Sequence, residues 1–378
     1  MGRRSHYLTI AAIITTTAVI AVAPPRVEAA TCAGGVNAGD LTTAFAGGLE
    51  RIAGADYQRA FRLPDGRRLW VFQDAFVRTP AGATPFIHNV GLVQRGACFR
   101  LLRSGTADGP RPWIGAARTT DQRRWFWPLS GTVGAHGRFR LFVAEMVERG
   151  PRYLSHTEPV ATWIATISLP RLRVVRLRPA PDPSSQLYGW SVVNRGAHTY
   201  LYGHCYRQFG WSPVGHAPCA GTVKVARVPR GRLAAAPTYW NGVRWTAQPR
   251  QAVNIAPRHG PGGEARRVNP MQIARVGRCW IAVTKVGDWF GHSIYLDRAP
   301  TAHGPWRTAA VIPAVTLGPP STYNTYFASI TAIRGDNAVV GLSNNRWDGQ
   351  LSGAYRPTFQ SVPLRRWGCG AAGTLPRA

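Results

Sequence analysis

The chain has few acidic residues, only two lysines and no helix-like pattern. Its 378 residues include 17 Asp and Glu against 46 Lys and Arg, which gives a formal net charge of +29. The arginines are scattered along the whole length, whereas nucleic-acid-binding proteins usually cluster their basic residues in a run or stripe. We therefore expect no nucleic-acid partner. Two interpretations of the charge stay open: a compositional bias toward arginine, and attraction to an anionic cell envelope.

Several catalytic signatures are also missing. The sequence contains no G-x-S-x-G elbow, no P-loop, no H-E-x-x-H motif and no glycine fingerprint followed by a helix. It also lacks a C-x-x-C pair and any Cys/His cluster with zinc-like spacing. We expect no cofactor, although His88 and His204 leave a metal ion in a central channel as an open question.

The N-terminus predicts a secretory signal peptide over residues 1–30. A basic start precedes an apolar run from Tyr7 to Ala23, and Val27-Glu28-Ala29 offers a small-residue cleavage site. A retained membrane anchor is the alternative, but the threonines within the run and Pro24-Pro25 after it argue against a lasting span. We expect a secreted or envelope-located monomer without a stable membrane span, in which residues 31–378 form one domain.

All six cysteines follow this leader, and an even number in an exported chain predicts disulfides. Spacing alone does not select among the possible pairings. A local bridge between Cys205 and Cys219 is expected, because only a turn-rich segment separates them. Cys32 and Cys369 lie near the two ends, where a bridge between them would close the domain.

Five related segments recur along the chain. Each is a turn glycine, a polar step and an apolar, β-rich core, with a second β-like segment before it. They are GRRLWVFQD from Gly66, GRFRLFVAE from Gly137, GAHTYLYGH from Gly196, GRCWIAVTK from Gly277 and GDNAVVGLS from Gly335. More strand-like sequence follows each hairpin, and no sustained apolar helical period is found. Repeats of roughly four strands predict an all-β, five-bladed β-propeller. Their uneven spacing keeps a β-sandwich or irregular barrel as the alternative.

The repeat places one polar position at the same strand end in every unit. This position is the eighth residue after each turn glycine, and equivalent strand ends of a propeller surround one end of its channel. The residues are Asp74, Glu145, His204, Lys285 and Ser343. Either the series forms a functional ring, or it reflects strand ends that reach water.

The first unit carries an acid on each arm of its hairpin. Asp56 begins the first arm, Asp74 ends the second, and a Pro64-Asp65-Gly66 turn joins them. The two acids fall at the same end of an antiparallel pair, so both carboxylates can open onto one site. Glycoside hydrolysis requires two such groups. Glu145 is the candidate third carboxylate, with an ion pair to an arginine as the alternative.

Aromatic, imidazole and amide side chains near these segments suit sugar binding. Aromatic rings pack on the C–H faces of sugars, while imidazoles and amides bond their hydroxyl groups. For any single tryptophan, packing between blades is the alternative. The candidate substrate-binding residues are His88, Asn89, Trp127, Trp190, His204, Asn269 and Tyr326.

The first hairpin also carries a family resemblance. The pattern that runs from Asp56 through LPDGR to Asp74, followed by F-x-H-N at Phe86–Asn89, resembles five-bladed propeller glycoside hydrolases. It is most similar to the actinobacterial endo-D-arabinanase family, which cleaves the arabinan of mycobacterial arabinogalactan and lipoarabinomannan. The resemblance implies an inverting reaction with Asp56 and Asp74 as acid and base, without assigning the two roles. It also implies an arabinan-type cell-wall polysaccharide as the partner.

This chain departs from that family next to one of the acids. It has Gln73-Asp74-Ala75 where the family usually has Gly-Asp-Thr. Two other functions therefore stay open from the sequence: a propeller that binds glycan without cleaving it, and a basic scaffold associated with the envelope.

Overall fold

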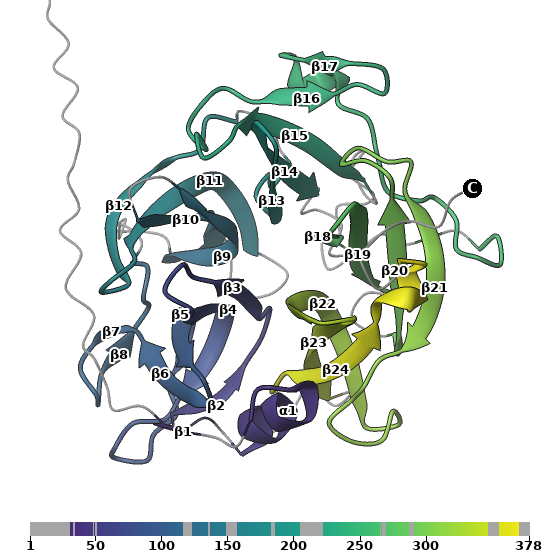
Figure 1. Ribbon diagram of the computed structural model, residues 1–378. Coiled ribbons are helices and arrows are strands. Elements are labelled where there is room, and N and C mark those ends of the chain that lie inside the picture. Colours follow the sequence, from purple (N-terminus) through teal and green to yellow (C-terminus); the bar gives the residue numbers. More distant parts are fainter. Residues whose placement is uncertain are drawn as a thin grey trace, which may run out of the picture.

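Five antiparallel sheets stand around a common axis in the computed structural model (Figure 1). This arrangement confirms the predicted five-bladed β-propeller and excludes the alternative sandwich or barrel. The residues that the structure describes are 31–32, 35–47, 49, 51–115, 123–134, 137–148, 157–182, 186–204, 222–264, 266, 270–286, 291–346 and 355–369.

The first blade has a divided inner strand. Its strands are β1 (Thr31–Cys32), β2 (Ile52–Ala55), β3 (Arg59–Arg62), β4 (Arg68–Val77), β5 (Phe86–Arg95) and β6 (Cys98–Leu102). The order across the sheet is β1-β6-β5-β4-β2, and β3 pairs with the other half of β4. A separate two-stranded sheet follows, made of β7 (Ser104–Gly105) and β8 (Pro110–Arg111). β2 and β3 thus form one inner strand that is broken at residues 56–58.

The other four blades follow in chain order, and the first strand of each lies nearest the axis. The second blade comprises β9 (Arg123–Gly134), β10 (Arg138–Glu148), β11 (Thr157–Ser168) and β12 (Arg173–Pro179). The third comprises β13 (Ser191–Arg195), β14 (His198–His204), β15 (Val223–Pro229), β16 (Thr238–Trp240) and β17 (Trp245–Thr246), followed by the short helix η2 (Pro249–Gln251).

The fourth blade comprises β18 (Gln272–Val276), β19 (Cys279–Lys285), β20 (Ser293–Ala299) and β21 (Arg307–Pro313). The fifth comprises β22 (Tyr323–Arg334), β23 (Asn337–Arg346) and β24 (Thr358–Pro363), followed by η4 (Leu364–Trp367). The expectation of about four strands in each unit therefore holds only for the second and fourth blades. The described sheets contain six, four, five, four and three strands.

The predicted turn glycines define the repeat in three dimensions. All five lie between the first two strands of a blade, and their φ angles range from +52° at Gly335 to +82° at Gly66. Residues with a Cβ rarely adopt this left-handed region, which explains glycine at these positions. We call the end of the propeller that carries these turns the turn face.

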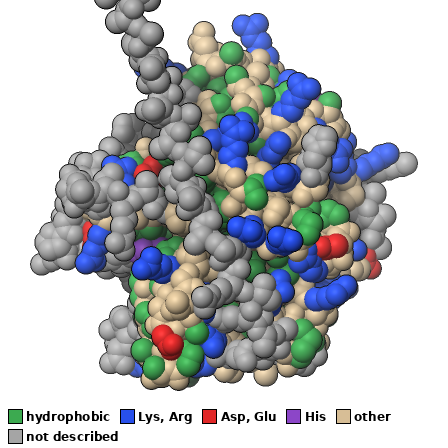
Figure 2. Space-filling view, turned by 90° about the vertical axis from the view of Figure 1, so that its left-hand side faces the viewer, with side chains coloured by type: hydrophobic (Ala, Val, Ile, Leu, Met, Phe, Trp, Pro, Cys, Tyr) green, Lys and Arg blue, Asp and Glu red, His purple; other side chains and the backbone are tan. Residues whose placement is uncertain are grey.

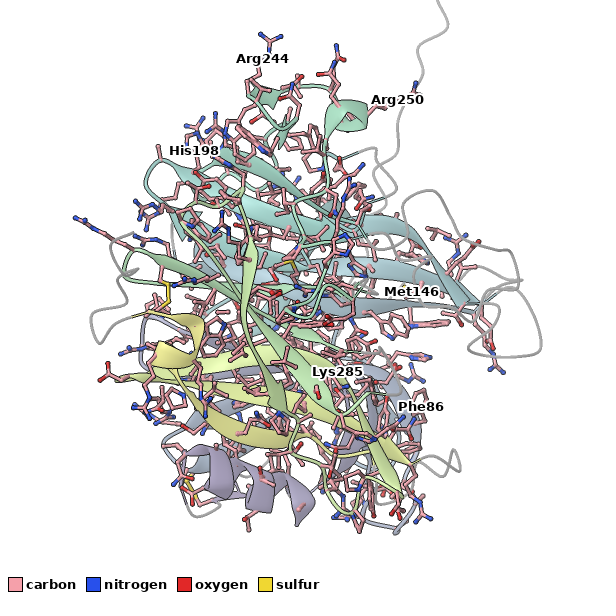
Figure 3. All side chains as sticks on the ribbon, turned by 90° about the vertical axis from the view of Figure 1, so that its right-hand side faces the viewer. Phe86, Met146, His198, Arg244, Arg250 and Lys285 are labelled. Atoms are coloured by element: carbon pink, nitrogen blue, oxygen red, sulfur yellow. A yellow bond between two sulfur atoms is a disulfide. The ribbon has the colours of Figure 1, made fainter. Side chains whose placement is uncertain are left out.

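The opposite end is where β4, β10, β14, β19 and β23 finish, and we call it the acid face. The edge-on view separates the two ends (Figure 3). Phe86 and Met146 lie toward the acid face in that view, and His198 lies toward the turn face. The five equivalent polar positions, from Asp74 to Ser343, therefore share one end of the propeller.

The second strand of each blade is buried on both sides. In β4, Leu69 and Val71 belong to an apolar cluster shared with the second blade. Trp70 and Phe72 point to the other side and pack in a cluster shared with the fifth blade. Successive strand residues point to opposite faces of a sheet, so burial between two neighbours requires a continuous apolar run.

A short helix helps to close the ring, and the sequence did not predict it. Helix α1 (Ala38–Ala46) begins at Asn37, whose side chain forms a capping box with Asp40. Phe45 lies 5.4 Å from the ring of Phe359 in the fifth blade and 5.8 Å from Trp70 in the first. The helix therefore packs against both blades at which the described chain begins and ends (Figure 1).

Two disulfides are present among the described residues, and neither joins the two ends. Cys32 is bonded to Cys98 within the first blade, and Cys279 of β19 is bonded to Cys369. The expected bridge from Cys32 to Cys369 is therefore wrong, because each end is fastened to a neighbouring strand. Cys205 and Cys219 lie outside the described residues. Among the described residues, no helix has the length and apolar character that a membrane crossing needs.

Removing the second disulfide tests how strongly it holds the C-terminus. The bridge spans 90 residues of sequence, and closing a loop of that size lowers the entropy of the unfolded chain. We expect the double substitution Cys279→Ala and Cys369→Ala to lower the free energy of unfolding by about 4 kcal/mol. Denaturant unfolding measures the change, and non-reduced peptide mapping checks the pairing. A peptide linking Cys32 to Cys369 would contradict the structure.

Candidate active site

The break in the inner strand brings the two acids of the first hairpin together. At the break, the Asp56 amide donates to the Asp74 carbonyl at 3.1 Å, and the Gln73 amide donates to the Asp56 carbonyl at 3.2 Å. Tyr57 follows with a φ of +49°, a left-handed value that is uncommon outside glycine. Its amide donates to the Ser343 hydroxyl of the fifth blade at 2.9 Å. The chain therefore turns at Asp56, and its carboxylate faces the end of β4.

Asp56 is almost fully buried and holds its proton more tightly than an ordinary carboxyl group. Its Oδ1 accepts from the Asp74 amide at 3.1 Å, and its Oδ2 accepts from the Tyr326 hydroxyl at 3.0 Å. Burial, followed by the nearby Asp74 charge, raises the pKa of Asp56 well above its usual value. Hydrogen bonds from Tyr355, Tyr326 and the backbone oppose this rise without cancelling it.

Tyr355 reaches Asp56 because the chain after β23 packs closely on β2. The amide of Ala55 donates to the Tyr355 carbonyl at 2.6 Å. A Cβ at Gly54 would lie 2.6 Å from the same oxygen, so only glycine fits there. Burial and the charge of Asp56 raise the pKa of the Tyr355 hydroxyl, which keeps it a neutral donor.

Asp74 has a different environment. Its Oδ1 accepts from Trp127 Nε1 at 3.0 Å and lies 2.7 Å from His88 Nδ1. His88 is directly opposite Asp74 across β4 and β5, so strand pairing itself brings the imidazole to the carboxylate. Asp74 therefore lies between an imidazole and an indole N–H, an environment unlike that of Asp56.

A row of rings extends outward from Asp74. The imidazole of His88 stacks on Trp125 with centroids 4.2 Å apart, and it meets the edge of Phe86 at 5.3 Å. Phe86 in turn lies 5.1 Å from Phe76. The side chain of His88 is 22% exposed, whereas that of Asp74 is 7% exposed, and Phe86 is exposed while Asp56 is buried. This aromatic row is the solvent-facing part of the described site.

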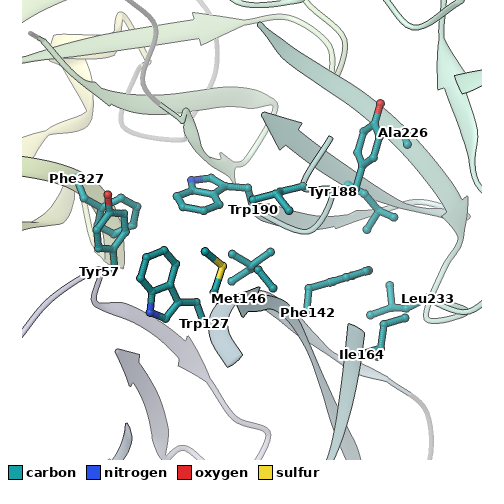
Figure 4. Packing of buried hydrophobic residues seen from close by; sticks show 14 of the residues in the cluster. Tyr57, Trp127, Phe142, Met146, Ile164, Tyr188, Trp190, Ala226, Leu233 and Phe327 are labelled. Carbon is teal, nitrogen blue, oxygen red and sulfur yellow. The ribbon is translucent and has the colours of Figure 1, made fainter. Parts of the chain in front are cut away.

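An arginine crosses the channel beneath the acids. The guanidinium carbon of Arg59 lies 4.6 Å from the ring centroids of both Trp190 and Phe327. One of its nitrogens donates to the carbonyls of Tyr57 and Pro128, each at 3.2 Å. Burial lowers the pKa of Arg59 to about 9, so it remains a cation at neutral pH. Figure 4 shows Tyr57, Trp190 and Phe327 gathered at this level.

The remaining members of the polar series are mostly buried, contrary to a simple view of solvated strand ends. His204 lies beside Trp190, with ring centroids 4.1 Å apart. Burial and the Arg59 charge lower the pKa of His204 to about 3, so its imidazole is neutral. Lys285 donates to the Val286 carbonyl at 2.9 Å. Ser343, as noted above, binds the backbone at the strand break. These groups support the channel around the acid pair.

Glu145 has partners of its own. Its Oε1 accepts from Arg124 at 2.9 Å, and its Oε2 accepts from Trp163 Nε1 at 2.8 Å. The contact with Arg124 is the ion pair that was the alternative to a catalytic role for Glu145. The position is equivalent to Asp74 in the repeat, but the second blade has no broken inner strand, since β9 is continuous. Among the described residues, no second acid is therefore brought to its side in the way that Asp56 is brought to Asp74.

Three other expected substrate-binding residues have different outcomes. Asn89 is fully buried with a φ of +53°, and its amide nitrogen donates to the carbonyls of Ile114 and Phe126. The Asn89 amide thus holds two backbone carbonyls, and a contact with substrate stays a prediction. Trp190 is also buried, as expected for a tryptophan that packs between blades, which was the alternative to sugar binding. Asn269 lies outside the described residues.

Two parts of this site were not identified from the sequence. Arg59 was one of many scattered arginines, and only its position three residues after Asp56 distinguished it. Tyr355 belongs to none of the repeated segments, so no pattern marked it. As to metals, the described residues contain no group of three His, Cys, Asp or Glu side chains arranged to hold an ion. Residues 149–156, 205–221, 287–290 and 347–354, which follow four of the strands ending at the acid face, are outside the described part.

The fold and the paired acids define a five-bladed propeller with a candidate active site at one end of its axis. A family model described as Domain of unknown function (DUF5005) matches residues 43–363, and the chain belongs to that family. No curated protein matches the sequence.

Solved structures share the architecture. A Bacteroides ovatus protein, provisionally described as a hydrolase, has a TM-score of 0.69 and 18% identity, covering 89% of this chain and 92% of its own. A GH43 protein of Bacillus licheniformis has a TM-score of 0.50 and 12% identity, covering 84% of this chain and 53% of its own. A GH43_1 enzyme from Xanthomonas citri has a TM-score of 0.49 and 15% identity, covering 89% and 96%. At these identities the likeness concerns the fold.

Tyr326→Phe tests the environment of Asp56. The Tyr326 hydroxyl stabilises the charged carboxylate and thereby lowers the pKa of Asp56, so its removal should raise that pKa further. Carboxyl ¹³C chemical shifts followed across pH measure the change. Tyr295→Phe is the matched control, because it removes a hydroxyl that binds Glu264 in the fourth blade. An unchanged or lower pKa of Asp56 in Tyr326→Phe would contradict the described contact.

Asp56 should also make stability depend on pH. Because its pKa is raised in the folded protein, it favours folding below the ordinary carboxyl pKa, and this contribution is lost as pH rises through the folded pKa. The melting temperature of Asp56→Asn minus that of wild type should therefore increase as the pH is raised from 4 to 7. Melting temperatures of both proteins across this range measure the effect. A relative loss of stability toward pH 7 would show that the carboxylate is not penalised by burial.

Proposed function

We propose that this protein is a secreted glycoside hydrolase that cleaves arabinofuranosyl linkages of a cell-envelope polysaccharide with inversion. The observation that carries the proposal is the buried acid pair, whose members have distinct environments at one mouth of the channel. A hydrolase of this class needs one carboxyl group that retains a proton and one that does not. The raised pKa of Asp56 suits the first role, and the contacts of His88 and Trp127 with the Asp74 carboxyl group suit the second.

The environments favour Asp56 as the acid and Asp74 as the base. In the proposed reaction, protonated Asp56 gives its proton to the glycosidic oxygen as the bond from that oxygen to the anomeric carbon breaks. Asp74 takes a proton from a water molecule whose oxygen bonds to the anomeric carbon from the opposite side. One water is consumed, and both products carry a free hydroxyl. His88 and Trp127 hold Asp74 in place for this step.

The substrate class is supported by two features. Within the aromatic row of Phe76, Phe86, His88 and Trp125, Phe86 and His88 are the members exposed to a sugar, and Trp125 packs behind His88. The arabinan specificity and the inversion rest on the resemblance of the first hairpin to endo-D-arabinanases. The Bacillus licheniformis protein is described as GH43, and that description applies to it alone. Its structural likeness to this chain supports the propeller fold of the proposed enzyme.

Export is the proposed location. The predicted leader over residues 1–30 supports it, and so do two disulfides, since such bonds persist in oxidising compartments.

A non-catalytic glycan-binding propeller is the second candidate. Both acids are at most 5% exposed, and Gln73 beside Asp74 directs its amide to the Pro128 carbonyl at 3.3 Å. An acid pair used only for binding and stability would look similar. Measured affinity for arabinan without any release of oligosaccharide would favour this candidate.

Substitution of each acid separates the two candidates. We expect Asp56→Asn and Asp74→Asn each to reduce the rate of arabinan cleavage by about 10³-fold, because each loses a proton-transfer group. Chromatography of the oligosaccharides measures the rate, and ¹H NMR of the first product shows its anomeric configuration. Asp65→Asn is the matched control, since this exposed acid lies in the same hairpin and pairs with Arg67. Equal rates in all four proteins would refute the assignment of the two acids.

A further inference from the structure

A second site candidate lies on the turn face, where the first and fifth blades meet. A groove of about 540 Å³ is bordered by Arg62 and Arg68 of the first blade and by Arg334 of the fifth. Ala60 and Ile333 contribute apolar surface between the three arginines. We call this feature the arginine groove. It is distinct from the candidate active site, because Arg68 is six residues along the continuous strand β4 from Asp74, a distance of roughly 20 Å.

The positive charge of the groove is not balanced by nearby acids. Arginine is spread over much of the surface (Figure 2), so the number of arginines alone would mean little. The nearest acid of the hairpin turn, Asp65, is bound to Arg67 at 2.6 Å. Within the described part of the chain, Arg62, Arg68 and Arg334 form no ion pair, and Asp336 in the fifth-blade turn pairs with none of them.

Arg68 shows that these charges are held close together. Its guanidinium group donates to the Thr331 carbonyl across the blade interface. Burial, followed by the charges of Arg334 and Arg62, lowers the pKa of Arg68 to about 10. It is still protonated at neutral pH, so three cations face one groove at a mutual electrostatic penalty. An anion in the groove would remove that penalty.

We infer that the arginine groove binds a phosphate group carried on a small organic molecule or chain. Guanidinium groups bind phosphate through paired, charge-assisted hydrogen bonds, and a phosphate carries more charge and more acceptor oxygens than a single carboxylate. The volume lies in the range of small-molecule sites and exceeds what a phosphate alone would fill. Ala60 and Ile333 offer contacts for the organic part. A phosphomonoester or a phosphodiester therefore matches the groove better than inorganic phosphate does.

Because of where the groove lies, ligand binding to it can be measured by thermal stability, without any measurement of catalysis. The two blades that border it are also the blades joined by helix α1, where the ring closes. A ligand held by both blades binds only the closed ring, so it should raise the melting temperature, and the rise grows with the logarithm of its concentration relative to Kd. Activity at the acid face is not expected to change.

The experiment compares ligands and charge-matched variants at constant ionic strength. Inorganic phosphate, glycerol 3-phosphate and acetate are titrated into the full chain by calorimetry, with melting temperature as a second measurement. The double variant Arg62→Ala and Arg334→Ala removes two groove cations. The control, Arg244→Ala and Arg250→Ala, removes two exposed cations of the third-blade region (Figure 3).

We expect the groove variant to bind glycerol 3-phosphate about 100-fold more weakly than wild type, because two charged hydrogen-bonding groups are lost. The control variant should bind like wild type, and acetate should bind neither protein measurably. Tighter binding of glycerol 3-phosphate than of inorganic phosphate supports an ester ligand, and equal binding of the two would overturn it. Equal weakening in both double variants, or no phosphate binding by wild type, would overturn the inference.

Discussion

The structure depends on one constraint: the second strand of each blade is buried on both faces. Leu69 and Val71 face one neighbouring blade, while Trp70 and Phe72 face the other. An ionised side chain inside such an interface would lose its hydration without replacement. A buried acid therefore needs polar partners, and Asp74 has them in His88 and Trp127 near the end of β4.

A single irregularity turns one such strand end into a paired site. The second blade has a continuous inner strand and an acid bound by Arg124, whereas the first blade has a broken inner strand and two adjacent acids. The left-handed backbone of Tyr57 is unfavourable by itself, and it persists because the Ser343 hydroxyl and the Phe327 ring, stacked at 4.5 Å, hold it. The fifth blade thus supports the geometry of the first.

Sequence patterns were most informative where the structure is local. The five turn glycines and the strands that follow them were predicted in place, because a tight turn and a continuous apolar strand leave signals within a few residues. The predicted disulfide between Cys32 and Cys369 was wrong, because the closeness of two cysteines to the chain ends does not say which strands lie beside each of them. The left-handed backbone of Asn89 and the hydrogen bond that its side-chain oxygen accepts from the Ile114 amide have no sequence signature.

The sequence by itself determined the blade repeat, the position of one acid on each arm of the first hairpin, and the shared end at which both arms place them. Only the tertiary structure decided that Tyr326, 270 residues away, donates to Asp56. It likewise decided that Arg59 crosses the channel and that three arginines border one groove. Hydrogen bonds within a hairpin follow from chain order, whereas contacts across the axis depend on how five blades close into a ring.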